Sequence, residues 1–347
     1  MLKQCQKFSS KSFKDPSELT NSTLKLIHVI FRHGNRTPAA HAYKDDVQET
    51  GYKPYGPGQL TNAGKETMYK LGQFIRQNYN NFLGEYFPGV IQARTTCVDR
   101  TQCSLQLFLA GLYPPRNKLV WDPALLWQPI PYITTNIEHD SILQAFTFNP
   151  NYKIAYREYQ KKFNFRKKNL DLVKYIEKHS KKKIETIKDV WLLYFQLIMQ
   201  VELGIEIPEW TKKIFPNPME EIASTYYVHT CATSQLRTLV LKPLTDKIIH
   251  DTKSKLEKKD AAVLMYVYSG HEVNIAHTLI ALNSFKPTHI PQYGSCVILE
   301  VHQFDDEVYI KGLYKLANKP YTILLQLWNK NPLEFKEFVE NIDANYK

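Results

Sequence analysis

The chain has 347 residues, 43% of them hydrophobic, and a formal net charge of +11. This length is typical of a globular protein with two domains, or with one domain that carries a large insertion. The positive charge favours anionic substrates, but no zinc-finger spacing, RNP pattern or basic heptad indicates nucleic-acid binding. No stretch approaches the roughly 18 apolar residues that a membrane span needs.

The N-terminal segment is predicted to form a flexible arm over residues 1–22. It is polar, rich in Lys and Ser, and lacks the apolar core of a secretory signal. Asn21-Ser22-Thr23 is a glycosylation sequon, which is compatible with export but also occurs by chance.

An apolar strand followed by a cationic turn comes next, where residues 24–38 read LKLIHVIFRHGNRTP. A continuous apolar run is typical of a strand that is covered on both faces. Catalytic groups in open α/β sheets gather at the carboxyl ends of such strands. Because Arg32 and Arg36 flank His33, the turn indicates anion capture by two guanidiniums with an imidazole between them.

A second strand and two helices are predicted after a Gly- and Pro-rich loop at residues 41–58. Thr61 or Asn62 can cap the first helix, which has apolar residues at helical spacing. Residues 90–93 are predicted to form a short strand and residues 102–112 the second helix.

The middle of the chain, residues 122–225, is richer in Tyr, Lys and Asn and has mainly helical patterns. Helices are predicted over residues 152–179 and 187–203. The lysines that recur between residues 161 and 183 are interpreted as a solvated helix face, with attraction of anionic substrates as the alternative.

A second apolar strand is predicted at residues 261–268, after a helix at 234–256 that Pro243 breaks or kinks. The strand ends in a glycine followed by His271 and Glu272, and a helix begins at or just after Glu272. A phosphate near this helix start would be favoured by free backbone N–H groups. A hairpin at a sheet edge is predicted from residues 295–314.

Three segments carry a resemblance to a known family: R-H-G-x-R-x-P at residues 32–38, R-T-T-C-V-D-R-T at 94–101 and S-G-H-E at 269–272. On these segments the chain resembles the histidine acid phosphatases and is most similar to the insect venom branch. The resemblance covers about residues 24–314. It implies an α/β fold, a phosphoglycerate-mutase-like three-layer α/β/α sandwich with a largely helical inserted cap. The implied parts are an arm at 1–22, a core at 23–121 and 226–320, a cap at 122–225 and a tail at 321–347.

The resemblance also implies roles for the first two segments. His33 would be the nucleophile that becomes a phosphohistidine, in a pocket that solvent reaches. Arg32 and Arg36 would hold the phosphoryl oxygens. Arg94 would be the third phosphate clamp, whereas Arg100 would be structural.

In the third segment, His271 would bind phosphate and Glu272 would be the proton donor. The family usually has His-Asp at this point, and Glu is one methylene longer than Asp, so the position of the donor stays open. The alternative is that Glu272 only stabilises the start of a helix.

The implied reaction is the hydrolysis of phosphate monoesters, either small molecules or phosphoproteins. Guanidiniums near His33 would disfavour the imidazolium and keep the nucleophile neutral at acidic pH. No metal or other cofactor is expected. The resemblance implies an extracellular or lysosomal protein, with a homodimer as one option. The alternatives are a weakly catalytic phosphate-binding homologue and an inositol-phosphate phosphatase or phosphomutase on the same scaffold.

Five cysteines, at positions 5, 97, 103, 231 and 296, leave at least one thiol unpaired. They do not form a C-x-x-C or a Cys/His metal spacing. Family members usually have a disulfide near the C-terminus, and residues 321–347 have no cysteine, so at least one such bridge is expected to be absent. The pairing stays open.

Overall fold

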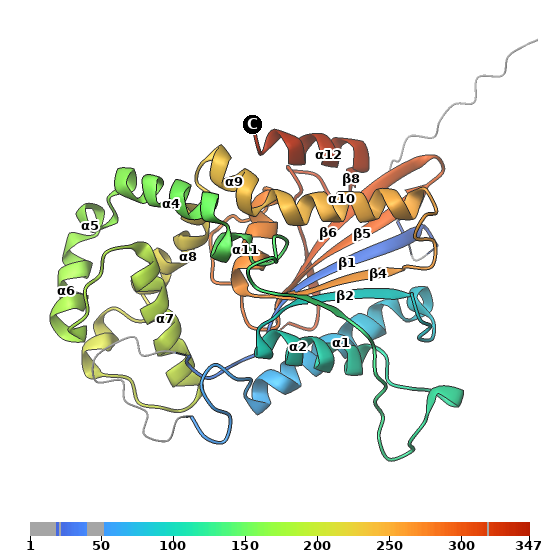
Figure 1. The fold of residues 1–347 in the computed structure, drawn as a ribbon, viewed down its shortest axis with the longest axis horizontal. Helices are drawn as coiled ribbons and strands as arrows, with labels where there is room; N and C mark the ends of the chain where they lie inside the picture. The colour runs from blue at the N-terminus through green and yellow to red at the C-terminus, as the bar shows by residue number, and fades with distance from the viewer. Residues whose placement is uncertain (1–18, 21, 40–51, 318) are drawn as a thin grey trace, which may run out of the picture.

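The computed structural model describes residues 19–20, 22–39, 52–317 and 319–347. Most of the predicted arm, Asn21 of the sequon, Cys5 and most of the loop at 41–58 lie outside the described residues. The described part of the chain forms a mixed sheet with helices on both faces and a group of helices beside it (Figure 1). This arrangement confirms the predicted α/β fold with a helical cap.

The sheet has eight strands within the described residues. Neighbouring strands follow the order β3-β2-β4-β1-β5-β6-β7, and β8 pairs with β6. Strands β3, β2, β4 and β1 are parallel, whereas β5, β6, β7 and β8 are added by antiparallel pairing. The strands are β1 (Leu24–Arg32), β2 (Ile91–Thr96), β3 (Ile133–Thr135), β4 (Met265–Gly270), β5 (Cys296–Phe304), β6 (Glu307–Lys315), β7 (Thr322–Leu324) and β8 (Leu333–Glu334).

Parallel pairing of β1 with β4 sets the position of both histidine segments. Ile30 pairs with Tyr268 and Arg32 pairs with Gly270. The backbone N–H of His33 then donates to the Gly270 carbonyl at 3.0 Å. Because the carboxyl ends of these central strands coincide, the two turns that follow them lie side by side.

Each face of the sheet has its own layer of helices. Figure 1 shows α1 (Asn62–Leu83) and α2 (Asp99–Leu112) below the sheet, and α10 (Lys242–Leu256) and α11 (Glu272–Ala281) above it. Side chains alternate between faces along a strand, so Val29 packs in the core on the α1 and α2 side, while Ile30 packs in the core on the α11 side.

Helix α1 begins at the predicted cap, since Thr61 Oγ1 accepts from the Gly64 N–H at 3.2 Å. The predicted break at Pro243 is also confirmed: α9 (Ser234–Val240) ends before it and α10 has Pro243 in its first turn. The predicted C-terminal tail forms β7, β8 and α12 (Phe335–Ala344), and both strands hydrogen-bond to β6.

The helices beside the sheet occupy the left of Figure 1. They are α3 (Ala145–Phe148), α4 (Pro150–Phe163), α5 (Phe165–Lys168), α6 (Leu170–Ser180), α7 (Ile187–Glu202) and α8 (Met219–Thr230), with a 3-10 turn at Glu209–Lys213. The single helix predicted over 152–179 is wrong, because Asn164 adopts the left-handed conformation (φ 44°), which ends α4 and begins α5.

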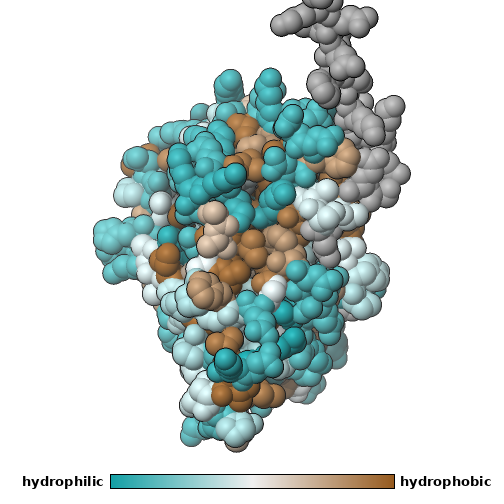
Figure 2. Space-filling model, turned by 90° about the vertical axis from the view of Figure 1, so that its right-hand side faces the viewer, coloured by the Kyte–Doolittle hydropathy of each residue, from teal (hydrophilic) through white to brown (hydrophobic). Residues whose placement is uncertain are grey.

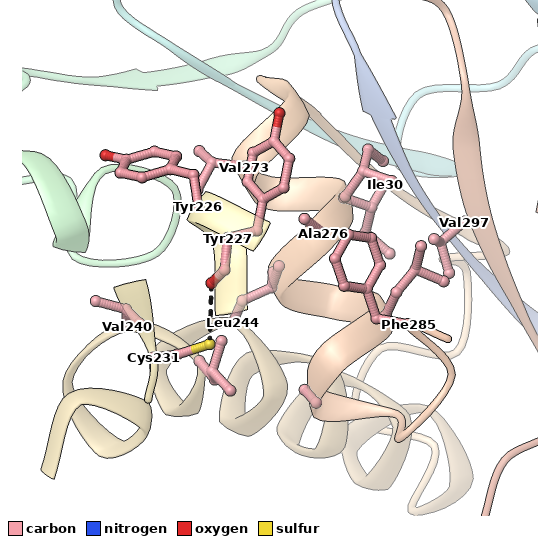
Figure 3. Close-up of a cluster of buried hydrophobic side chains, with 14 of the residues drawn as sticks. Ile30, Tyr226, Tyr227, Cys231, Val240, Leu244, Val273, Ala276, Phe285 and Val297 are labelled. Carbon is pink, nitrogen blue, oxygen red and sulfur yellow. Dashed lines mark hydrogen bonds between the residues drawn. The ribbon is translucent and has the colours of Figure 1, made fainter. Parts of the chain in front are cut away.

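The helical group packs on the upper layer through a buried apolar cluster. Figure 3 shows Tyr226 and Tyr227 of α8 beside Val273 and Ala276 of α11, with Ile30 of β1 close by. One continuous core therefore joins the helical group to the helices above the sheet, among them α11, which directly follows His271.

A long connection leads from α2 to the edge strand β3 and includes a 3-10 turn at Asn117–Leu119. It projects at the lower right of Figure 1 and exposes large apolar side chains, including Trp121 (59%), Leu126 (64%) and Ile133 (49%). In Figure 2, which faces this side, hydrophobic side chains lie among hydrophilic ones in the lower part of the molecule.

No helix in the described part of the chain is long and apolar enough to span a membrane. The four described cysteines, Cys97, Cys103, Cys231 and Cys296, are all free thiols.

Candidate active site

The candidate site lies where β1 and β4 end. His33 follows β1 and His271 follows β4, and their ring centroids are 5.5 Å apart. Both side chains are buried, with His33 only 1% exposed. The sequence prediction of a solvent-reached His33 is therefore wrong for this structure, since Arg100 and Tyr293 lie against the imidazole.

The partners of His33 fix which nitrogen holds its proton. Nδ1 lies 2.8 Å from the Gly34 carbonyl oxygen, which can only accept, so Nδ1 is the protonated nitrogen. Nε2 accepts from Arg100 Nε at 3.2 Å. The tautomer assigned from these contacts leaves the Nε2 lone pair pointing toward the guanidinium cluster.

Burial and positive charge keep His33 neutral. Burial lowers the pKa of this imidazole well below 6.5, and the charges of Arg100 and Arg32 lower it further, in that order. Desolvation disfavours the charged form of a base, and nearby cations act in the same direction. His33 therefore stays unprotonated at pH values at which an ordinary histidine would be cationic.

Arg32 is held rigidly beside the nucleophile. Its Nη1 donates to the Pro291 carbonyl at 2.6 Å, and its Nε lies 3.4 Å from Glu272 Oε2. The Tyr293 ring centroid is 3.7 Å from Arg32 Cζ, and the Phe195 centroid is 5.1 Å away on α7. The guanidinium is therefore fixed by two aromatic rings as well as by polar contacts.

Several donors around this cluster have no hydrogen-bond partner among the described residues. They are Arg32 Nε, which makes only the ion pair above, Arg36 Nε and the hydroxyl of Tyr293. Arg36 uses Nη1 to reach the Thr37 carbonyl at 2.8 Å. Buried donors are normally satisfied, and leaving them unpaired is costly. A small anion with several acceptor oxygens would satisfy this group of donors.

The third guanidinium of the cluster is Arg100 and not Arg94. Arg94 lies within β2, and its Nη1 donates to Thr135 Oγ1 on the neighbouring strand at 3.0 Å. Arg100 lies in the first turn of α2, next to His33. The prediction that Arg94 completes the clamp while Arg100 is structural is thus contradicted by the geometry. Of the predicted set, the structure brings together Arg32, His33, Arg36, His271 and Glu272.

The His271 turn is held by a polar network. His271 Nε2 lies 3.2 Å from both Thr96 Oγ1 and Gln144 Nε2. The backbone N–H of His271 donates to Asn274 Oδ1 at 2.8 Å, and Asn274 Nδ2 donates to the Leu143 carbonyl at 2.9 Å. Burial first, and then the charge of Arg100, lower the pKa of His271 to about 3.

Glu272 is the first residue of α11 and faces Arg32. Burial alone would raise the pKa of this carboxyl, but the charge of Arg32 acts in the opposite direction, and the pKa lies below the usual 4.5. Glu272 is therefore ionised in the free protein. A bound anion would share the charge of Arg32 and so raise the pKa of Glu272.

Sequence reasoning missed Arg100 as well as Tyr293, Gln144 and Asn274. Arg100 lies in a quoted segment, but that segment has two arginines, and its pattern alone does not say which one reaches the histidine. Tyr293 and Gln144 come from connections far along the chain, with no local pattern to signal them. Asn274 had a signal, since it lies three residues after a helix cap, where a side chain can bond back to the cap N–H.

A cavity of about 640 Å³ opens from the His271 turn. Its inner end is lined by Arg100, Gln144, His271 and Glu272, and its walls come mainly from α4 and α7. Within the described residues, no three His, Cys, Asp or Glu side chains are grouped closely enough to hold a metal ion.

The chain is similar to known proteins in sequence and in fold. Residues 23–315 match the family described as the Histidine phosphatase superfamily (branch 2). The chain is 35% identical to the venom acid phosphatase Acph-1 of Apis mellifera, over 92% of this chain and 85% of that protein. It is 28% identical to the prostatic acid phosphatase of Bos taurus, over 84% of this chain and 77% of that protein. Its fold is similar to that of the phytase from Klebsiella sp ASR1, with a TM-score of 0.69 at 14% identity over 94% of this chain and 96% of that one.

Proposed function

Because the chain belongs to the histidine phosphatase superfamily, branch 2, we propose that it is an acid phosphatase that hydrolyses phosphate monoesters through a phosphohistidine on His33. One observation carries the proposal: a buried, neutral imidazole has its Nε2 lone pair next to three guanidiniums, and two of these, Arg32 and Arg36, have an Nε that makes no hydrogen bond to any described residue. Its acid-phosphatase relatives support the same reaction.

In the first step, His33 Nε2 attacks the phosphorus in line with the leaving oxygen. The N–P bond forms as the P–O ester bond breaks. Arg32, Arg36 and Arg100 neutralise the charge on the three equatorial oxygens, and His271 contributes a further polar contact. These groups are held in place before the substrate arrives, so little reorganisation is needed in the transition state.

Glu272 supplies the proton that the leaving oxygen needs. Its carboxylate is ionised in the free protein, and a bound phosphoryl group raises its pKa, so it binds a proton together with the substrate. It then protonates the departing alkoxide. In the second step, the same carboxylate takes a proton from the attacking water, and the N–P bond breaks to release inorganic phosphate.

The first prediction tests this role with Glu272→Gln, which keeps the size of the side chain and removes the acid. Hydrolysis of glycerol phosphate, whose alkoxide is a poor leaving group, should slow about 10²-fold or more. Hydrolysis of p-nitrophenyl phosphate should slow much less, because p-nitrophenolate needs little protonation. The measurement is kcat on both esters together with inhibition by inorganic phosphate. Equal loss on both esters would show that Glu272 acts by positioning His271 or water.

The relatives also include lysosomal acid phosphatases, so we place the protein in an extracellular or lysosomal compartment, where Asn21 would be glycosylated. Small-molecule and phosphoprotein monoesters are both candidate substrates.

We also propose a homodimer formed through the connection before β3 and that edge strand. Its exposed apolar side chains, such as Trp121, Leu126 and Ile133, form a surface of the kind that usually packs against a partner. Light scattering should give twice the chain mass for the wild type and the mass of one chain for Leu126→Asp. Leu170→Asp, at an exposed leucine of α6, is the control and should remain dimeric. A monomeric wild type would rule out this interface.

A further inference from the structure

The cavity that opens from Glu272 has a composition that selects among phosphate monoesters. We propose that it binds leaving groups with a flat apolar body and a negative charge at the far end, so that the preferred substrates are acidic aryl phosphates. This inference rests on the proposed phosphatase function and goes beyond it by naming a substrate class and the residues that recognise it.

The walls of the cavity are aromatic. Tyr152 and Tyr156 of α4 line it and are stacked with centroids 5.6 Å apart and an interplanar angle of 9°. Trp191 of α7 lines it from another side, packs 5.0 Å from Tyr226, and is anchored by its Nε1, which donates to Tyr227 Oη at 3.1 Å. Rings held in this way offer a preformed apolar slot for a planar group.

The cavity is also cationic. Lys153 and Arg157 lie one turn apart on α4, and Lys188 comes from the first turn of α7; all three line the cavity. Glu272 is the one acidic side chain among the lining residues in the described part of the chain.

Among the residues that the structure describes, these three cations have no carboxylate partner. Nearby lysines on the same helical group do have one, since Lys183 pairs with Glu185 and Lys212 pairs with Glu209. No such ion pair involves Lys153, Arg157 or Lys188 within the described residues. An anionic substituent would therefore find guanidinium and ammonium groups that are not already neutralised.

The experiment compares two esters of nearly equal size and shape, 4-carboxyphenyl phosphate and 4-carbamoylphenyl phosphate. The ratio of their kcat/KM values measures recognition of the carboxylate, because both esters share the same phosphate site. Wild type should prefer the carboxylate. The variant Lys153→Gln, Arg157→Gln, Lys188→Gln should lower the ratio about tenfold, the factor expected for one charge-assisted contact.

A matched control removes the same charge elsewhere on the helical group. Lys167→Gln, Lys174→Gln, Lys178→Gln changes exposed lysines that do not line the cavity and should leave the ratio unchanged. An equal fall of the kcat/KM ratio in the control would mean that the overall charge of the protein is responsible. An unchanged ratio in the first variant would mean that Lys153, Arg157 and Lys188 do not recognise the carboxylate of the substrate. Either result overturns the inference.

Two further outcomes separate the possible failures. If inositol hexakisphosphate is turned over in preference to both aryl esters, the substrate class is a hydrated polyphosphate and the inference is wrong. If the wild type hydrolyses no monoester at all, the proposed function itself fails. Turnover of both esters with no preference for the carboxylate leaves the phosphatase function intact and contradicts the substrate class alone.

Discussion

Replacement of His33 by alanine is expected to lower kcat for p-nitrophenyl phosphate by at least about 10⁴-fold, because the covalent route is lost with the nucleophile. The fold should persist, since His33 is not part of either apolar core of the sheet. A thermal melt followed by circular dichroism checks the fold. His139→Ala, at an exposed histidine, is the control and should retain wild-type kcat.

The same mechanism predicts a labelled intermediate. Wild type that is mixed briefly with labelled substrate and quenched in alkali, in which phosphohistidine persists, should have phosphate on His33. Label on a serine, or normal turnover by His33→Ala, would contradict the mechanism.

Arg100→Gln is expected to have the second-largest effect and to change the pH dependence. Loss of one preorganised cation should lower kcat/KM by about 10²- to 10³-fold. After burial, the charge of Arg100 is the strongest influence that lowers the pKa of His33. Without it the pKa of His33 rises, more imidazole is protonated in acid, and the acidic limb of the pH–rate profile should move to higher pH.

Arg94→Gln is the matched control for Arg100→Gln. Its side chain bonds to Thr135 and not to the histidine, so its profile should keep the wild-type acidic limb and its inhibition by phosphate should be near normal. If Arg94→Gln weakens phosphate inhibition while Arg100→Gln does not, the assignment of the third guanidinium is reversed.

The central strands and the two histidine turns were predictable because their signals are local. An apolar run that ends in a polar turn indicates a buried strand, and two such parallel strands must end at the same edge of the sheet. His33 and His271 therefore come together as expected.

The choice between Arg94 and Arg100 was not predictable in this way. Arg94 lies two residues before the end of β2, roughly 6.6 Å back from the sheet edge at the usual rise per residue. Its side chain therefore meets β3, whereas the first turn of α2 extends beyond the strand end and brings Arg100 to the site. Only the tertiary position of the turn distinguishes them.

The cationic residues of the cavity could not be identified from the sequence either. The lysine run at 161–183 is the most conspicuous charge pattern in the middle of the chain. The cavity is lined instead by Lys153, Arg157 and Lys188, at positions that the breaks between α4, α5 and α6 determine. A sequence read as one long helix cannot place these side chains on a common surface.

The contacts of Arg32 with Phe195 and Tyr293 have a consequence for how the two parts of the protein can move. Phe195 belongs to α7 of the helical group and Tyr293 to the connection before β5, so one guanidinium joins the two parts of the protein. A hinge motion that lifted α7 would remove one ring from a desolvated cation, at a cost of about 2 kcal/mol. Motion of α7 away from the sheet is therefore opposed right beside the nucleophile, because Arg32 belongs to β1 whereas Phe195 moves with α7.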